Sequence, residues 1–327
     1  MKPYLRAALA ASLTLAAASF VPSAAIAHAY PAKPIRLIVP YAPGGATDII
    51  SRAVALELTK TMGQAVTVDN RPGAGGNLGS EIAARSAPDG YTLLTSASSL
   101  HGITPFLYSK MTYDPNKDLL PVIVLAGFAN VLVVNPAVKA QSVKDLITLA
   151  KAQPGKLTYA SSGSGSTIHM SGEMFKHLVG LDITHIPYKG SGPAMIDLMG
   201  GQVDMMFDNI PSAITHVRSG KLRAMATTGP KRAGSFPDLP TMIEAGVSGF
   251  ESTAWFGIAV PVGTPRDIIA RLNAEGQKAI KSPEFVKRIT DLGYEIIGGT
   301  PEQMGAMIQD EVRRWGPIVK ASGAKVD

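Results

Sequence analysis

The sequence predicts an α/β fold of two lobes, with mostly parallel sheets and helices on both faces. Short β-branched segments alternate with helix-length amphipathic segments along most of the chain, a pattern typical of βα units and parallel sheets. The length of 327 residues corresponds to two domains at roughly 150 residues each. Two extended apolar segments, residues 127–134 and 250–260, are candidates for paired crossings between these domains.

The first third of the chain predicts strands and helices in strict alternation. Strands are expected over residues 34–40, 64–68 and 91–95, with helices over 47–62 and 79–87 between them. The inward face of the first helix is predicted to carry Ile49, Ile50, Ala53, Val54 and Leu58.

The middle of the chain continues the pattern, and the end is predicted to be helical. Ser142, with an acidic residue three positions later, is expected to cap a helix. From Thr264 onward, helix is predicted to follow helix. Thr264 and Thr300 each precede a proline and stand three residues before an acid or amide, which predicts helix caps. The remaining strands are expected over residues 122–125, 131–134, 157–160, 183–187, 203–207 and 222–226.

The N-terminal residues have the pattern of a cleaved secretory signal. Lys2 and Arg6 precede an apolar segment, and residues 25–27 form a small-residue cleavage site. A second such site at residues 27–29 leaves cleavage after Ala27 or Ala29 open. We therefore expect residues 1–27 to be removed and the protein to reach a bacterial periplasm. Because no cysteine follows the signal, no lipid anchor is expected.

Composition excludes several classes of function. The 46% of hydrophobic residues supports a packed core, and the absence of cysteine excludes disulfides, iron–sulfur clusters and cysteine nucleophiles. Loss of Lys2 and Arg6 lowers the net charge from +6 to +4. The remaining charges are scattered, so nucleic acid is not expected as a partner. No His-x-x-x-His spacing occurs, and we expect neither a metal site nor a cofactor.

The turn after the first predicted strand is a candidate anion-binding turn. In a parallel sheet this turn lies at the carboxyl end of the strand, where open α/β sheets bind ligands. Its glycines permit close backbone approach, and the helix that follows offers unpaired N–H groups. Asp48 is expected to act as a cap, because a carboxylate would repel an anion. The candidate residues here are Tyr41, Gly44, Gly45, Ala46, Thr47 and Asp48.

A second glycine-rich turn spans residues 70–79. It resembles a dinucleotide-binding loop, but Leu78 stands where the third glycine is required. The chain also lacks the Gly-Lys-Ser/Thr of a P-loop. An anion-binding turn and a flexible surface turn both remain open for this segment.

The third candidate turn is rich in serine and glycine and spans residues 161–169. Its hydroxyl and backbone groups offer several hydrogen bonds to a carboxylate without a fixed cation. No serine here has glycine two residues before and two after it, so the elbow of a serine hydrolase is missing. For His169, a capping role and ligand contact both remain open. The candidate residues are Ser161, Ser162, Gly163, Ser166 and His169.

Two further candidates stand at strand ends. Tyr188 follows the predicted strand 183–187, and the polar pair Asp208 and Asn209 follows the predicted strand 203–207, where it would face a cleft. Strand termination alone would also explain polar residues at these positions. Residues 114–118 begin like a calcium loop, but leucines replace its glycine and glutamate, so calcium is excluded.

From about residue 30 to its end, the chain resembles the extracytoplasmic solute receptors of the tripartite tricarboxylate transporter family, often called Bug receptors. The matching motifs occur in the same order along nearly the whole chain. They are YPxKPIR at 30–36, PYxPGGxxD at 40–48, NRPGAGG at 70–76, APDGYTLL at 87–94, YDPxKD at 113–118, SGxGSxxH at 162–169, PYKG at 187–190 and WFG at 255–257.

This resemblance implies a type II periplasmic binding protein, a Venus-flytrap whose lobes close on a small ligand. By this analogy lobe one is residues 30–127 plus 253–327, and lobe two is residues 128–252. The turn at residues 41–48 and a turn of the third strand would hold one carboxylate, and the serine-rich loop would hold the other end of the ligand. The third-strand turn in this resemblance is residues 96–99, and the resemblance implies that Ser96, Ala97 and Ser98 contact the ligand. Some relatives approach the ligand with an acidic residue at the position of Asp208. His101 stands where relatives vary, so ligand identity does not transfer.

The resemblance further implies a monomer that delivers a small carboxylate to a tripartite tricarboxylate-type membrane transporter. Because no turn combines a nucleophile, a base and an orienting group, no catalysis is expected. Two alternatives remain. One is a ligand sensor for a membrane signalling kinase, which gene neighbours would distinguish. The other is an exported serine hydrolase using Ser162 or Ser166 with His169, for which no third orienting residue is evident.

Overall fold

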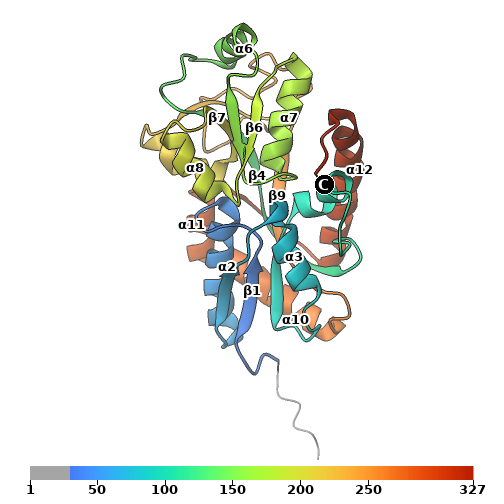
Figure 1. Ribbon diagram of the computed structural model, residues 1–327. Coiled ribbons are helices and arrows are strands. Elements are labelled where there is room, and N and C mark those ends of the chain that lie inside the picture. Colours follow the sequence, from blue (N-terminus) through green and yellow to red (C-terminus); the bar gives the residue numbers. More distant parts are fainter. Residues whose placement is uncertain (1–29, 327) are drawn as a thin grey trace, which may run out of the picture. The chain divides into compact units, whose positions relative to one another are not determined.

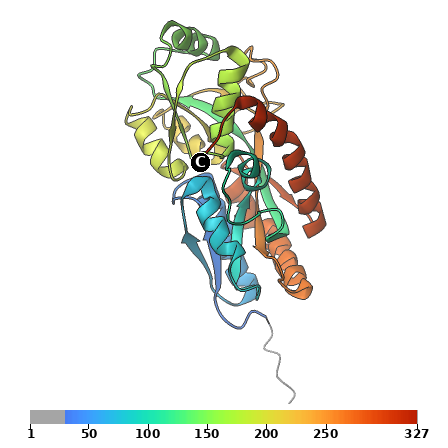
Figure 2. The ribbon, with the colours of Figure 1, turned by 45° about the vertical axis from the view of Figure 1, so that its right-hand side comes forward.

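The computed structural model describes residues 30–326. The predicted signal at residues 1–27 lies outside this range. Residues from 33 onward form one unit of the chain, and the description below concerns that unit. Figures 1 and 2 show its helices and strands from two directions.

The first strands and helices alternate as the sequence predicts. Strand β1 (Ile35–Val39) pairs in parallel with β2 (Val66–Asn70) and with β3 (Thr92–Ala97). Between them lie α2 (Ala46–Met62) and α3 (Asn77–Ala84). In α2, Ile50, Ala53, Val54 and Leu58 are buried against the sheet, whereas Ile49 is only half-buried. A short helix, η1 (Ala74–Gly76), precedes α3, and two more, α4 (Ser98–Gly102) and α5 (Thr104–Leu107), follow β3.

Two long strands join the two halves of the sheet. The two strands predicted at residues 122–125 and 131–134 are a single strand, β4 (Leu119–Val134). Residues 119–129 of β4 pair antiparallel with β9 (Thr253–Pro261), and its last residues pair with strands of the second half instead. The predicted paired crossings are therefore confirmed. The antiparallel pair formed by β4 and β9 therefore lies between two groups of parallel strands.

The second half repeats the βα pattern. Strand β5 (Thr158–Ser161) pairs in parallel with β6 (Thr184–Pro187) and with β7 (Met205–Asn209). Ser142 caps α6 as predicted, because its side chain accepts a hydrogen bond from the Asp145 N–H. The other members of this half are α6 (Val143–Ala152), α7 (Thr167–Val179), α8 (Ser191–Met199), α9 (Ile210–Arg218) and β8 (Arg223–Thr227).

The last part of the chain returns to the first half. A short strand, β10 (Glu295–Gly298), interrupts the predicted series of helices and pairs antiparallel with β4. Thr300 forms the predicted capping box. The predicted cap at Thr264 is wrong, because its hydroxyl donates to the Pro261 carbonyl and the helix begins one residue after Pro265. The helices here are α10 (Arg266–Lys281), α11 (Pro283–Thr290) and α12 (Pro301–Ser322).

Each half has its own buried clusters. In the second half, Tyr159, Phe175, Phe207 and Phe250 pack together on one side of the strands. In the first half, Ile38 and Leu94 pack under α3. A further cluster joins the halves, because Met170 of the second half packs with Leu107 and Trp315 of the first. Strands β4 and β9 also link the halves, through the chain and through their hydrogen bonds (Figure 1).

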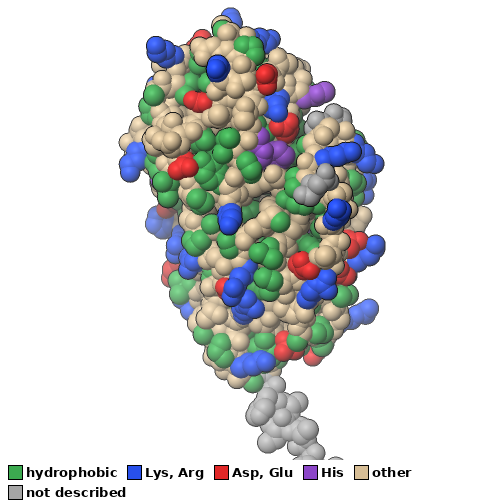
Figure 3. Space-filling model, in the orientation of Figure 1, with side chains coloured by type: hydrophobic (Ala, Val, Ile, Leu, Met, Phe, Trp, Pro, Cys, Tyr) green, Lys and Arg blue, Asp and Glu red, His purple; other side chains and the backbone are tan. Residues whose placement is uncertain are grey.

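Acidic and basic side chains are interspersed on the face drawn in Figure 3. Among the described residues, no helix is both long and apolar enough to cross a bilayer.

Candidate ligand-binding site

Turns from both halves meet around a small cavity of about 20 Å³. This space admits about one water molecule, so a larger solute enters only if the halves separate. No lining residue carries a charged side chain. The lining residues are Tyr41, Thr47, Ala97, Ser98, Ser99, Ser162, Ser166, Thr167, Asn209, Ala254 and Phe256.

Helices begin at this cavity from both sides. Thr47 is the second residue of α2, and Thr167 is the first residue of α7. Ser166 caps α7, and Asn209 occupies the cap position of α9. The first N–H groups of a helix have no partner within it, and the helix dipole makes that end positive. The cavity wall therefore combines positive helix ends with hydroxyl and amide groups, which suits an anion without requiring a cationic side chain.

In the first turn, the structure brings Tyr41 and Thr47 to the cavity and directs Asp48 elsewhere. The Asp48 carboxylate accepts hydrogen bonds from the N–H of Gly44 and from Asn70, and it pairs with Arg52 at 2.9 Å. Burial alone would raise the pKa of Asp48, but these hydrogen bonds hold it below its usual value. Asp48 thus fixes the turn rather than facing the cavity, as its sequence position predicts.

The glycines of this turn contact the second half. A Cβ built on Gly45 would lie 3.2 Å from Cβ of Ser191, and one built on Gly44 would lie 3.7 Å from Cα of Gly192. Ala46 is buried at the start of α2, and its carbonyl accepts the hydroxyl of Tyr294 at 2.5 Å. These three residues support the turn without lining the cavity.

In the third-strand turn, Ala97, Ser98 and Ser99 line the cavity, whereas Ser96 is engaged behind it. The Nδ1–H of His101 donates to the side-chain oxygen of Asn116, so Nε2 is free to accept the Ser96 hydroxyl at 2.7 Å. Burial lowers the pKa of His101 to about 4, in keeping with a neutral ring. His101 therefore orders this turn from within the protein.

In the serine-rich loop, Ser162 and Ser166 line the cavity, whereas Ser161 and His169 hold the loop in place. The Ser161 hydroxyl is 2.7 Å from Nε2 of His185 and accepts the N–H of Gly163 at 3.1 Å. Nδ1 of His169 accepts the N–H of Gly165 at 3.2 Å.

The imidazole ring of His169 stacks on that of His185 in β6. The centroids of His169 and His185 are 4.1 Å apart. Burial is the main cause that lowers the pKa of His169 to about 4 and that of His185 to about 3. Both rings are therefore neutral near pH 7, and the Nδ1 of His169 remains able to accept its hydrogen bond.

The two strand-end candidates lie behind the cavity wall. The Tyr188 hydroxyl donates to Asp197 at 2.7 Å. The fully buried Asp208 accepts hydrogen bonds from the hydroxyls of Ser191 and Ser212. Burial raises the pKa of Asp208 to about 6, although its hydrogen bonds oppose this effect.

The sequence did not single out two residues of the wall, Ala254 and Phe256, as site candidates. Ser99 and Thr167 lie within the predicted turns 96–99 and 161–169, and Asn209 is the second residue of the polar pair predicted after strand 203–207. Phe256 belongs to the WFG motif on β9, but only the pairing of β9 with β3 brings it to the cavity. Ala254 carries no sequence signal.

Three contacts at the edge of the cavity join the two halves. The N–H of Ala42 donates to the carbonyl of Lys189 at 2.9 Å, and the Tyr108 hydroxyl donates to the carbonyl of Ser164 at 3.0 Å. A Cβ built on Gly75 would lie 1.9 Å from the Ser164 carbonyl oxygen. The glycine-rich second turn therefore contacts the serine-rich loop rather than lining the cavity.

Within residues 30–326, no group of three or more histidine, cysteine, aspartate or glutamate side chains is arranged to hold a metal ion.

Solved structures define the class of protein. A protein of R. palustris solved with adipate has a TM-score of 0.88 and 37% identity, covering 91% of this chain and all of that one. The periplasmic binding protein BugD has a TM-score of 0.88 and 34% identity over 90% of this chain and 99% of that one. MatC from Rhodopseudomonas palustris, with bound malate, has a TM-score of 0.86 and 34% identity over 89% of this chain and all of that one. The fold is thus that of two-lobed periplasmic binding proteins.

Sequence comparison gives the family. Residues 50–324 match the tripartite tricarboxylate transporter family receptor, TctC. Protein BugT of Bordetella pertussis is 42% identical over 301 residues, 92% of each chain. A UPF0065 protein from the tcbD–tcbE intergenic region of Pseudomonas sp. (strain P51) is 37% identical, over 89% of this chain and 87% of that protein. The chain belongs to the TctC family of receptors, which confirms the resemblance.

Proposed function

We propose that this receptor binds a small carboxylate in the cleft between its lobes, in the periplasm, and delivers it to a membrane transporter of the tripartite tricarboxylate type. The observation that carries the proposal is the cavity wall, which combines helix starts from both lobes with hydroxyl and amide groups and has no charged side chain. Such a wall stabilises a carboxylate through N–H groups and helix dipoles.

The relatives support this ligand class. The R. palustris protein was solved with adipate and MatC with malate, and both ligands are dicarboxylates. From these two relatives we infer only that the ligand of this chain is a carboxylate. We infer no particular compound, because the names of the relatives do not identify the contacts that select one acid.

We place lobe one at residues 30–127 plus 253–327 and lobe two at residues 128–252. The change of partner along β4 supports these limits, because Ala129 pairs with β9 and Asn130 pairs with β7. A solute enters when the lobes separate. As the lobes close again and the contacts at the edge of the cavity reform, the side chains of the cavity wall shift to fit the solute. The solute favours the closed form because only that form brings both sets of helix starts to it.

We propose no catalytic step. The Ser166 hydroxyl accepts the backbone N–H of His169, and the ring of His169 accepts the N–H of Gly165. Ser161 does contact His185, but it is fully buried and does not line the cavity. Neither pair presents a serine to a solute with a free base beside it.

The direct test is a calorimetric titration of the purified protein with adipate, malate, longer and shorter dicarboxylates, and their uncharged diamides. We expect at least one acid to bind and its diamide not to bind. Thr47→Val should weaken binding about two- to tenfold, because it removes one hydroxyl from the wall. The matched control is Thr148→Val on the exposed surface of α6, which should leave affinity unchanged. Equal binding of acids and diamides would contradict the anion site.

Delivery is tested separately in cells. Deleting the gene should abolish uptake of the acid identified by titration, and restoring the gene should recover it. Unchanged uptake, together with loss of an acid-dependent transcriptional response, would favour a sensor instead.

A further inference from the structure

A second and much larger cavity, of about 450 Å³, lies behind the crossing strands. Its volume is within the range of small-molecule sites, roughly 300–1,000 Å³. Ala254 is the one residue that lines both this rear cavity and the small cavity described above. Phe128 lines the rear cavity and Phe256 the small one, and their ring centroids are 4.7 Å apart. A layer of packed aromatic rings on β4 and β9 therefore separates the two spaces.

Both lobes and both crossing strands form the walls of the rear cavity. Residues 229–235 and Ile210 come from lobe two. Gly293 and Tyr294, just before β10, and Glu295 and Ile297, within β10, come from lobe one. Because the packed rings on β4 and β9 separate the rear cavity from the small one, we expect a hinge motion about these strands that opens the small cavity to narrow the rear one. An occupant of the rear cavity would resist that motion.

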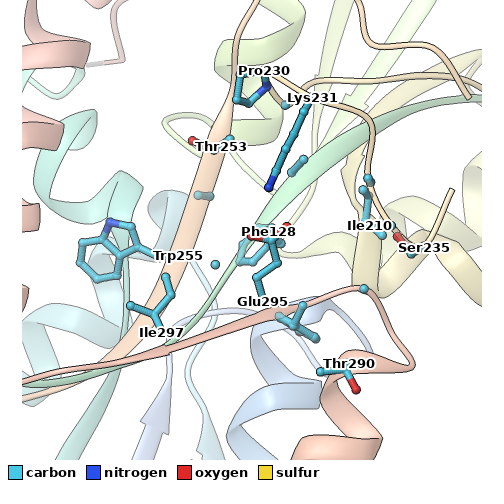
Figure 4. A pocket seen from close by; sticks show the side chains of 18 of the residues that line it. Phe128, Ile210, Pro230, Lys231, Ser235, Thr253, Trp255, Thr290, Glu295 and Ile297 are labelled. Atoms are coloured by element: carbon cyan, nitrogen blue, oxygen red, sulfur yellow. The ribbon is translucent and has the colours of Figure 1, made fainter. Parts of the chain in front are cut away.

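The charges in the rear cavity indicate what would occupy it. Arg232 pairs with Glu244 at 2.8 Å, and Glu311 pairs with Arg314 at 2.9 Å, so these four groups are already engaged. Among the described residues, Lys231 forms no ion pair, and its side chain extends toward Phe128 and Glu295 in Figure 4.

Glu295, on β10, likewise forms no ion pair within the described part of the chain. Phe128, Ile297 and Met307 add apolar surface to the lining of the same cavity. The cavity thus presents one cation, one anion and an apolar surface. A ligand with a carboxylate, an ammonium group and a hydrocarbon side chain matches all three, whereas a simple anion would be repelled by Glu295.

We propose that the rear cavity is a second ligand site, that it takes a small zwitterion with an apolar side chain, of the chemistry of leucine or phenylalanine, and that its occupancy favours closure of the front cleft. Lys231 binds the carboxylate of this effector and Glu295 its ammonium group. The coupling between the sites rests on the lobe closure proposed above, but binding in the rear cavity does not depend on it. By linkage, each ligand raises the affinity for the other by the same factor.

The first test is calorimetric titration of the purified protein with L-phenylalanine and L-leucine. 3-Phenylpropionate and phenethylamine, which each lack one of the two charges, are the matched probes. We expect the amino acids to bind at least about fivefold more tightly than either probe. Lys231→Met and Glu295→Gln should each weaken amino acid binding about fivefold, whereas Lys144→Met on α6 should not. Unchanged binding in both cavity variants would overturn the rear site.

Variants of the front cleft locate the ligand independently. If Thr47→Val weakens phenylalanine binding and Lys231→Met does not, the amino acid occupies the front cleft. That result would overturn the rear site while leaving a receptor function intact. If phenylalanine binding depends on Lys231 and no carboxylate binds anywhere, the rear site stands and the proposed carboxylate function fails.

The coupling is tested by titrating the front-cleft acid with and without saturating phenylalanine. We expect about a threefold or greater gain in affinity for the acid, and an equal gain for phenylalanine when the acid is saturating. In Lys231→Met the gain should disappear at the same phenylalanine concentration. Equal affinities with and without phenylalanine in the unmodified protein would overturn the coupling.

Discussion

The hydroxyl of Tyr108 donates a 3.0 Å hydrogen bond to the backbone carbonyl of Ser164, and these residues belong to different halves of the sheet. Burial is the main cause that raises the pKa of Tyr108 to about 12, so the hydroxyl keeps its proton and its role as donor at any physiological pH. Ser164 lies within the serine-rich loop that supplies Ser162 and Ser166 to the small cavity. This bond therefore connects lobe closure directly to the order of a cavity loop.

Replacing Tyr108 by phenylalanine should weaken carboxylate binding by about two- to tenfold, because one hydrogen bond of the closed form is lost. Titration calorimetry with the best acid from the panel measures this change. Tyr113→Phe is the matched control, since its hydroxyl bonds to Asn77 within the same half. An effect of Tyr113→Phe as large as that of Tyr108→Phe would contradict a specific role in closure.

A methyl group at residue 192 should prevent full closure. Gly192 lies in the first turn of α8, and a Cβ there would sit 2.2 Å from the Pro43 carbonyl oxygen of the opposite lobe. We expect Gly192→Ala to bind acid at least tenfold more weakly and, by small-angle scattering with acid present, to have a larger radius of gyration than the unmodified protein. Its unfolding midpoint without acid should be unchanged.

The control for Gly192→Ala is Gly305→Ala on α12, where the nearest atom to a new Cβ is 3.9 Å away. Because alanine is the better helix former, this variant should be equally or slightly more stable and should bind normally. Normal binding by Gly192→Ala would show that the contact with Pro43 is not part of the liganded state.

Ser166→Ala should affect both stability and binding. The Ser166 side chain accepts the N–H of His169 at 3.1 Å and caps α7, and loss of such a cap costs about 1 kcal/mol of folding free energy. The same hydroxyl lines the small cavity. Denaturant unfolding and calorimetry should therefore both change. Ser142→Ala, which removes the cap of α6, should lower stability by a similar amount without changing affinity. Equal affinities of Ser166→Ala and Ser142→Ala for the acid would show that the Ser166 hydroxyl does not contribute to ligand binding.

The free energy of unfolding should fall as the pH decreases from about 6.5 to about 4. Burial lowers the pKa of His101 and His169 to about 4 and that of His185 to about 3, whereas an unfolded histidine titrates near pH 6.5. In this window the unfolded chain binds more protons than the native one, so acid favours unfolding. Asp208 acts oppositely, because its native pKa of about 6 lies above the unfolded value, and the three histidines outnumber it.

Denaturant unfolding between pH 7 and pH 4.5 measures this dependence. His101→Gln should flatten the curve by up to one proton, because it removes one of the buried imidazoles. His177→Gln, at an exposed position of α7, should leave the slope unchanged. A free energy of unfolding that stays constant across this range would contradict the burial of these rings.

The sequence predicted most of the fold because local patterns specify it. Alternating strands and helices, the cap at Ser142 and the capping box at Thr300 depend on neighbours a few residues apart. Strand β10 was missed because a strand of four residues owes its existence to pairing with β4. The cap at Thr264 failed for a similar reason, since its hydroxyl bonds back to Pro261 at the end of β9.

For the small cavity, the sequence by itself marked the turn at residues 41–48 and the serine-rich loop, because glycines, serines and helix starts after strands mark the carboxyl ends of parallel strands. The third-strand turn followed only from the family resemblance, and the glycine-rich turn at residues 70–79 does not line the cavity. The sequence did not determine which side chains of the turns reach the cavity. Asp48 and Asp208 accept hydrogen bonds from Asn70 and Ser191, which lie far away in the sequence. Ser96 bonds to His101, whose ring is held in turn by Asn116. Only the tertiary structure decided which side chains reach the small cavity, and only the tertiary structure assembled the rear cavity. Both cavities depend on contacts between segments that pack together only once the two lobes are built on β4 and β9.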